Sequence, residues 1–266
     1  MDTFRKHLER QGLSANTVES YSWTAQKFTA RYGHPTAESL LQFKEDLIRE
    51  HRPQTVNVRL IAMNRYLSFI GHPELKVRVV RLGRKNFLEN VISDADYRFF
   101  KRRLKADGRE MWYYLVWFLA ATGARVSELR QVKAEHVSAG HLDIYAKGGK
   151  VRRLYIPRRL RTEIAAWLGQ RGVTSGYIFL NRFGRRLTSR GIAQQLKRYG
   201  RRYGLEPSVV YPHSFRHLFA RNFLDRRRDI AMLADLMGHE SIETTRIYLR
   251  RTSPEQQSEV DHIVDW

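Results

Sequence analysis

Two histidines and an arginine lie close together in YPHSFRHLF, residues 211–219. His213 and His217 are four residues apart, so on a helix they would share one side, as the zinc ligands of H-E-x-x-H sites do. However, Ser214 stands where that motif has its glutamate, and Arg216 would put a fixed positive charge beside the metal. The pattern therefore favours an anion, such as a phosphate group, over a zinc ion.

Other short strings contain residues suited to the same anion: Arg125 in ATGARVSELR, Lys147 beside a Gly-Gly pair, His239 in LMGHE and Tyr248 in TTRIYLR. Guanidinium groups stay charged and match the geometry of phosphate, so Arg125 and Arg216 are natural clamps. Taken singly, each residue has an ordinary alternative. Arg125 would suit a protein surface, Lys147 an exposed turn and His239 a helix cap, while most tyrosines belong to a core or a surface.

The charge balance indicates a class of partner. The chain has 266 residues, with 48 Lys and Arg against 27 Asp and Glu and a net charge of +21. Such an excess attracts polyanions, of which nucleic acid is the common one, and the alternative is a basic surface without a specific partner. The absence of cysteine excludes disulfides and thiolate metal sites and is compatible with a reducing cytoplasm.

The sequence shows no signal for membrane insertion or export. The first twelve residues, MDTFRKHLERQG, lack an apolar stretch, and the longest apolar run, residues 111–121, is too short to span a bilayer. We therefore expect a soluble cytoplasmic protein without a membrane partner, and a buried helix over residues 111–121.

Residues 1–75 predict a helical domain. Apolar residues recur at helical spacing over residues 13–33, with Ser14 or Asn16 placed to cap the helix. Further helices are expected over residues 2–11, 36–51 and 52–71, the last with Pro53 in its first turn. Residues 76–90 form a basic stretch that we interpret as a linker, in which Arg84 and Lys85 are candidate nucleic-acid contacts.

Residues 91–266 predict a second domain that is mostly helical and contains one β-hairpin. Residues 140–157 alternate around Gly148-Gly149, a two-residue turn signal between short strands. After Ile156 the patterns indicate helices throughout. One of these, over residues 188–204, ends in four cations that either contact DNA or face solvent: Lys197, Arg198, Arg201 and Arg202.

In their order along the chain, these strings resemble the tyrosine recombinases of the phage integrase family. Catalytic domains of that family carry T-G-x-R-x-x-E-L, a lysine in a β-hairpin, H-x-L-R-H, L-G-H and a tyrosine nine residues after the last histidine. The strings LSANTVESY and PQTVNVRLIAMNRYLSFIG resemble the family's helical, SAM-like core-binding domain. Ala146, Phe215 and Met237 depart from the pattern, and all three are packing or turn positions.

The resemblance implies a mainly α-helical fold with a small β-sheet and a simple two-domain, Xer-like site-specific recombinase, without an additional arm-binding domain. Such an enzyme cuts and rejoins DNA strands through a 3′-phosphotyrosyl intermediate. The intermediate retains the bond energy, so neither a metal nor another cofactor is expected. The implied partners are double-stranded DNA, with the enzyme associated with the nucleoid, and further copies of the protein in a homotetramer on paired DNA sites.

The resemblance also implies a role for each residue of the site. Transesterification at phosphorus builds charge on the nonbridging oxygens, which Arg125 and Arg216 would stabilise. Tyr248 would be the nucleophile, and because a free tyrosine has a pKa of about 10, it needs a base or nearby positive charge. The other implied roles are His213 as the base, Lys147 as the general acid, His239 as a hydrogen-bond donor to the phosphate, Glu128 as an orienting residue and His217 as a supporting one.

Two alternative functions use the same residues. A type IB topoisomerase has a similar tyrosine and cationic pocket but returns the cut strand to its own partner. A sequence-specific DNA-binding protein would carry the same residues in an inactive site.

The C-terminal tail, residues 254–266, differs in charge from the rest of the chain. It contains four carboxylates and neither Lys nor Arg. Val260, Ile263, Val264 and Trp266 have the spacing of an apolar helix stripe. Since DNA would repel an acidic segment, we expect the tail to dock on protein, either its own chain or a neighbouring protomer.

Overall fold

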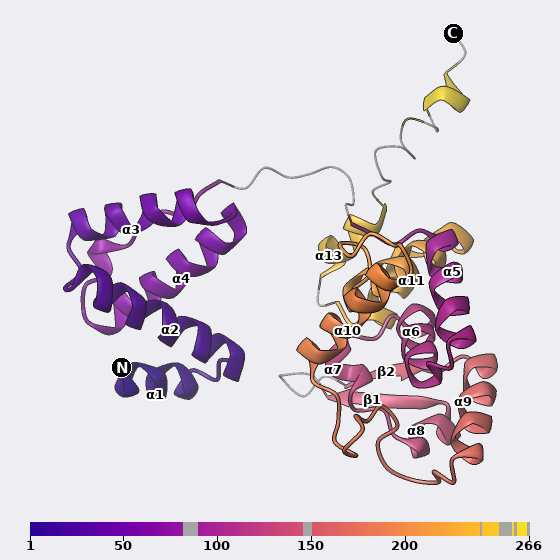
Figure 1. The fold of residues 1–266 in the computed structure, drawn as a ribbon. Coiled ribbons are helices and arrows are strands. Elements are labelled where there is room, and N and C mark those ends of the chain that lie inside the picture. Colours follow the sequence, from indigo (N-terminus) through magenta and orange to yellow (C-terminus); the bar gives the residue numbers. More distant parts are fainter. Residues whose placement is uncertain (82–89, 146–150, 240, 250–256, 258–259, 265–266) are drawn as a thin grey trace. The chain divides into compact units, whose positions relative to one another are not determined.

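The structure of the protein is a computed structural model (Figure 1). It describes residues 1–81, 90–145, 151–239, 241–249, 257 and 260–264. The chain divides into two compact units, Met1–Arg84 and Lys85–Trp266. The mainly α-helical fold with one small sheet is confirmed over these residues. None of the described helices is long and apolar enough to cross a membrane.

The first 75 residues of the first unit form helices joined by short connections, and the predicted helix starts at Ser14 and Pro53 are confirmed. Ser14 caps a helix by accepting a hydrogen bond from the backbone N of Thr17 at 3.2 Å, and Pro53 lies in the first turn of another. Phe28 and Leu60 belong to its buried core. The elements are α1 (Asp2–Arg10), α2 (Ala15–Tyr32), α3 (Ala37–Glu50), α4 (Pro53–Phe69) and the 3-10 helix η1 (Pro73–Leu75).

Residues 76–81, expected to begin the linker, lie against α4 instead. The Asn64 side chain accepts a hydrogen bond from the backbone N of Val77 and donates one to its carbonyl, both at 2.9 Å. Asn57 forms the same pair of bonds with the backbone of Val80. Two polar side chains of α4 thus satisfy an extended backbone, so this part of the expected linker packs on the first unit. Arg84 and Lys85 lie outside the described residues.

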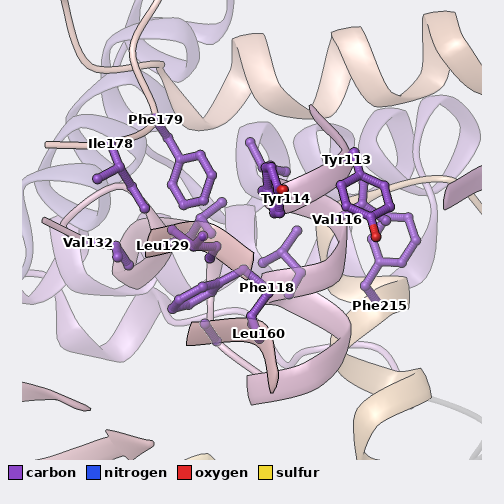
Figure 2. Packing of buried hydrophobic residues seen from close by; sticks show 14 of the residues in the cluster. Tyr113, Tyr114, Val116, Phe118, Leu129, Val132, Leu160, Ile178, Phe179 and Phe215 are labelled. Atoms are coloured by element: carbon purple, nitrogen blue, oxygen red, sulfur yellow. The ribbon is translucent and has the colours of Figure 1, made fainter. Parts of the chain in front are cut away.

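The second unit is built around α6, the apolar segment predicted to be buried. Phe118 of α6 and Phe215 of α11 are fully buried (Figure 2). Leu119 and Leu218 of the same two helices, which pack against each other, are also fully buried. The helices are α5 (Asp94–Ala106), α6 (Glu110–Thr122), α7 (Val126–Leu129), α8 (Ala134–Ala139), α9 (Arg158–Gln170), α10 (Ser189–Arg202), α11 (Pro212–Arg226), α12 (Ile230–Met237), α13 (Ile242–Arg246) and the 3-10 helix η2 (Ile247–Leu249).

The predicted strands are present as β1 (His141–Tyr145) and β2 (Val151–Tyr155), which pair antiparallel with His141 opposite Tyr155. Their predicted turn, with Lys147, lies outside the described residues. The expectation of helices throughout the chain after Ile156 is wrong for residues 171–188, which are irregular and include isolated β-bridges. Glycines at 172, 176 and 184 adopt positive φ there, a conformation that interrupts a helix.

The described part of the acidic tail is small. Residues 260–263 are helical, and Val260 and Ile263 are 53% and 56% exposed. The apolar residues expected to dock on protein are therefore uncovered where the structure describes them.

Candidate active site

The end of α6 positions the first arginine of the site. Gly123 closes α6 in the left-handed conformation with φ +63°, and a side chain there would overlap the ring of Phe219. Arg125 lies two residues after Gly123 and immediately before α7, in whose first turn Glu128 lies. Glu128 is 4% exposed and accepts hydrogen bonds from the Arg125 backbone N at 2.7 Å and from Arg125 Nη1 at 2.9 Å. The carboxylate therefore fixes both ends of Arg125.

Arg152 of β2 is a residue of this cluster that the sequence analysis missed. Its Nη2 donates to Glu128 Oε2 at 3.0 Å, and its Nη1 donates to the carbonyl of Met237. Gly238 leaves room for Arg152, because a side chain at position 238 would overlap the aliphatic part of the Arg152 side chain. The strand pattern held a signal: Arg152 alternates in phase with buried Leu154, so its charge lies on the inner face of the sheet.

Arg216 of α11 is the most deeply buried cation of the site, at 1% exposed. It donates to the carbonyl of Gly123 and, at 2.7 Å, to that of Met237, and its Nη2 lies 3.1 Å from His239 Nε2. Burial, and then the charge of Arg125, lower the pKa of Arg216 to about 10. Arg216 therefore stays charged at neutral pH.

The two hydrogen bonds of His239 define its tautomer. Arg216 has only donors, so Nε2 of His239 must accept in the 3.1 Å contact. Nδ1 then carries the proton and donates to Thr245 Oγ1 at 2.7 Å. Burial, followed by Arg216, Arg125 and Arg152, lowers the pKa of His239 to about 4, so the imidazole is neutral at pH 7. In this structure Nε2 of His239 thus accepts a hydrogen bond, whereas His239 was expected from the sequence to donate one to a phosphate.

Tyr248 lies in η2 and is only 5% exposed. Its ring is stacked on that of His239, with centroids 6.1 Å apart, and its centroid is 5.2 Å from that of His217. Burial raises the pKa of Tyr248, whereas the charge and hydrogen bond of Arg216, and then Arg125, act to lower it. Nearby guanidinium groups therefore offset part of the penalty that burial puts on the phenolate.

His213 and His217 share one side of α11, as their spacing predicts, with ring centroids 4.6 Å apart. His213 is exposed, and partial desolvation together with Arg216 and Arg125 lowers its pKa. Burial, and then His213 and Arg216, lower the pKa of His217 to about 4. Both imidazoles are neutral at pH 7 and able to accept a proton. Ser214 between them is fully buried and accepts a hydrogen bond from the backbone N of Ile92 at 2.8 Å.

The site has capacity for an anion. A pocket of about 520 Å³ is lined by Arg125, Arg152 and His239, among others. The buried Nε atoms of Arg152 and Arg216 find no hydrogen-bond partner among the described residues. Guanidinium groups that line a pocket, as those of Arg125 and Arg152 do here, are suited to phosphate oxygens. In the part of the chain that the structure describes, no three His, Asp or Glu side chains converge in a way that would hold a metal ion.

Most of the predicted site residues are brought together from distant segments. Arg125, Glu128, His213, Arg216, His217, His239 and Tyr248 lie in one cluster. The predicted general acid Lys147 falls outside the described residues, as do Arg84 and Lys85. The four cations of α10 that were predicted as DNA contacts are exposed and outside this cluster, and one of them, Arg202, forms an ion pair with Asp107 at 3.2 Å.

Arginines and neutral histidines clustered with a buried tyrosine beside a pocket are typical of one class of protein, the phosphoryl-transfer enzymes with a tyrosine nucleophile. Comparisons with known proteins agree. Residues 98–255 match the model of the phage integrase family. Tyrosine recombinase XerA of Pyrococcus furiosus is 31% identical over 98% of this chain and 92% of its own. Tyrosine recombinase XerC of Pseudomonas putida is 35% identical over 48% of this chain and 44% of its own.

Solved structures share the fold. The Tn1549 transposon integrase in complex with transposon right end DNA has a TM-score of 0.73 at 15% identity, covering 98% of both chains. The XerH recombinase bound to palindromic difH substrate, a post-cleavage complex, has a TM-score of 0.74 at 20% identity, covering 97% of this chain and 84% of its own. The chain belongs to the phage integrase family, and its function is site-specific DNA recombination of the tyrosine-recombinase type.

Proposed function

We propose that Tyr248 attacks a phosphodiester of duplex DNA and becomes linked to the 3′-phosphate. The observation that carries the proposal is the placement of Arg216, which contacts His239 beside the pocket that Arg125 lines, while the Tyr248 ring is stacked on that of His239. A bond from the tyrosine oxygen to phosphorus forms, and the bond from phosphorus to the 5′-oxygen breaks. One phosphoester replaces another, so the step consumes no external energy.

Arg125 and Arg216 would stabilise the charge that develops on the nonbridging oxygens, with Glu128 and Arg152 fixing the Arg125 side of the pocket. His213, neutral at pH 7, would take the phenol proton, and Lys147 would protonate the leaving 5′-oxygen. His217 would support this end of the site through its contacts with both His213 and Tyr248. Because Tyr248 is 5% exposed, attack also requires the segment around η2 to bring the hydroxyl into the pocket.

We further propose a homotetramer on paired DNA sites as the working assembly. A recombinase must exchange strands between two duplexes, each cut at two positions, so four nucleophiles are required. The exposed Val260 and Ile263, on a segment rich in carboxylates, suit docking on a neighbouring protomer. The exposed cations of α10, Lys197, Arg198 and Arg201, suit contacts to DNA phosphates.

The test uses a DNA duplex that the full-length protein selects from a random-sequence pool, prepared with a nick that traps the covalent complex. Tyr248→Phe removes only the hydroxyl, so we expect normal binding and no covalent complex on a denaturing gel. Covalent complex formed by this variant at the wild-type rate would refute the assignment. Relaxation of supercoiled DNA that lacks the selected site would instead favour topoisomerase activity.

A further inference from the structure

His239 faces two different hydrogen-bonding demands during the proposed reaction. Without DNA its Nε2 accepts from Arg216 Nη2 at 3.1 Å, and its Nδ1 donates to Thr245 Oγ1 at 2.7 Å. A phosphate oxygen is an acceptor, so His239 can bind one through Nε2 only if Nε2 carries a proton. A neutral imidazole has a single N–H, and Nδ1 must then become an acceptor.

Thr245 is placed to accommodate both states. It is fully buried in α13, three residues before Tyr248, and a hydroxyl both donates and accepts. When Nδ1 is protonated, Thr245 Oγ1 accepts, and when Nδ1 is deprotonated, the same hydroxyl rotates and donates. The change releases one proton from Nδ1 to water and takes one from water at Nε2, so the net charge of His239 is unchanged.

We propose that Thr245 is a positioning residue that allows His239 to exchange the Nδ1–H tautomer for the Nε2–H tautomer when the scissile phosphate displaces Arg216 from Nε2. The inference rests on the proposed function and adds to it the role that the family resemblance implies for His239, a hydrogen bond donated to the scissile phosphate. Thr245 also connects His239 to the nucleophile along the chain, because α13 continues directly into η2, which contains Tyr248.

The chain contains a matched control for this residue. Thr244 is adjacent but exposed, and its hydroxyl donates to the carbonyl of Ser241 at 2.6 Å rather than to a site residue. Thr245→Val preserves shape and removes the hydroxyl, Thr245→Ser preserves the hydroxyl, and Thr244→Val repeats the first change outside the site. Thermal melting of each full-length variant measures any loss of folding separately.

The first readout is single-turnover cleavage of the selected nicked duplex at saturating protein. We expect Thr245→Val to slow cleavage by about tenfold or more, and Thr245→Ser and Thr244→Val to stay within about twofold of wild type. DNA affinity should be unchanged in all three variants. Wild-type cleavage by Thr245→Val, or equal slowing by Thr245→Ser, would overturn the inference.

His239→Gln separates this inference from the proposed function. If that variant cleaves at the wild-type rate, His239 does not serve the reaction and the proposed role of His239 fails. If His239→Gln is slow while Thr245→Val cleaves normally, the role of His239 stands and only the inference about Thr245 is wrong.

The second readout observes the tautomer directly by ¹⁵N NMR of histidine-labelled full-length protein, with the His239 signals assigned by loss in His239→Gln. We expect Nδ1–H without DNA, and Nε2–H when Tyr248→Phe protein binds the selected duplex. A purely structural role of Thr245 would not change the tautomer between these states. An unchanged tautomer, or an imidazolium protonated at both nitrogens in the complex, would overturn the inference.

Discussion

Each unit of the molecule contains a carboxylate that is 4% exposed and lies beside two arginines: Asp46 in the first unit and Glu128 in the second. The partners of Asp46, Arg31 and Arg49, have side chains 57% and 70% exposed. Those of Glu128 are 41% exposed for Arg125 and only 10% for Arg152.

The difference shows what a buried carboxylate does in each unit. Asp46 also accepts from Tyr32 at 2.6 Å and from Gln42 at 3.2 Å, so it joins α2 to α3, and the arginines beside it extend into solvent. The arginines beside Glu128 also donate to backbone carbonyls at the end of α12, next to His239. Arg152 donates to the carbonyl of Met237, and Arg125 to that of Gly238. The first cluster holds a bundle together, and the second arranges cations around a pocket.

The largest contrast is expected between buried and exposed arginines. Arg216→Lys keeps a cation but loses the fork that reaches two carbonyls and His239, so cleavage should slow by about a hundredfold or more. Arg31→Lys beside Asp46 should leave the cleavage rate of the saturated complex unchanged. Single-turnover cleavage at saturating protein checks both variants. Similar cleavage rates for the two would show that the buried arginine contributes no more to catalysis than the exposed one.

The next effect is on stability. Glu128→Gln leaves Arg125 and Arg152 without their shared counter-charge, which should lower the free energy of unfolding by about 3 kcal/mol. Asp46→Asn should be milder, because solvent already screens the exposed partners of Asp46. Urea denaturation followed by circular dichroism compares the two variants. A greater loss in Asp46→Asn would contradict the ranking.

Two adjacent arginines of β2 allow the contribution of the Glu128 cluster to cleavage to be compared with that of an exposed ion pair. Arg152 reaches Glu128 at 3.0 Å, whereas the neighbouring Arg153 is exposed and pairs with Asp143 at 2.7 Å. Arg152→Lys should slow cleavage by about tenfold, because one ammonium cannot replace the two-sided contact, and Arg153→Lys should have little effect. Equal cleavage rates for the two variants would show that Arg152 only packs against Gly238.

The smallest effect is the pH dependence of the first cluster. The hydrogen bond from Tyr32, the largest of several favourable contacts, holds the pKa of Asp46 below its ordinary value of 3.8. The stabilisation should therefore be fully present above pH 3.8 and lost as pH falls through the lower folded-state pKa. The difference in melting temperature between wild type and Asp46→Asn should be constant from pH 7 to about pH 4 and shrink below it. A difference that grows in acid would contradict this sign.

Local signals in the sequence determined much of the architecture. The cap at Ser14, the Pro53 helix start, the buried apolar helix α6 and the pairing of β1 with β2 were all predictable. These features depend on residues a few positions apart, whose steric and hydrogen-bonding preferences act within one turn or one hairpin. The irregular segment 171–188 was mistaken for helix because glycines with positive φ leave only a weak local signal.

The resemblance of short motifs to a known family predicted most residues of the candidate site, including the short-range pair Arg125 and Glu128. Only the tertiary structure decided how they are used. Arg152 reaches a carboxylate 24 residues away, Arg216 a carbonyl 93 residues away, and Arg125 a carbonyl 113 residues away. Such contacts exist only once α6, α11 and α12 have packed and buried these cations, and that packing also sets the proton of His239 on Nδ1. Long-range hydrogen bonding is a property of the whole second unit, so a local pattern such as the alternation of Arg152 with Leu154 can indicate an inward face but not the partners found there.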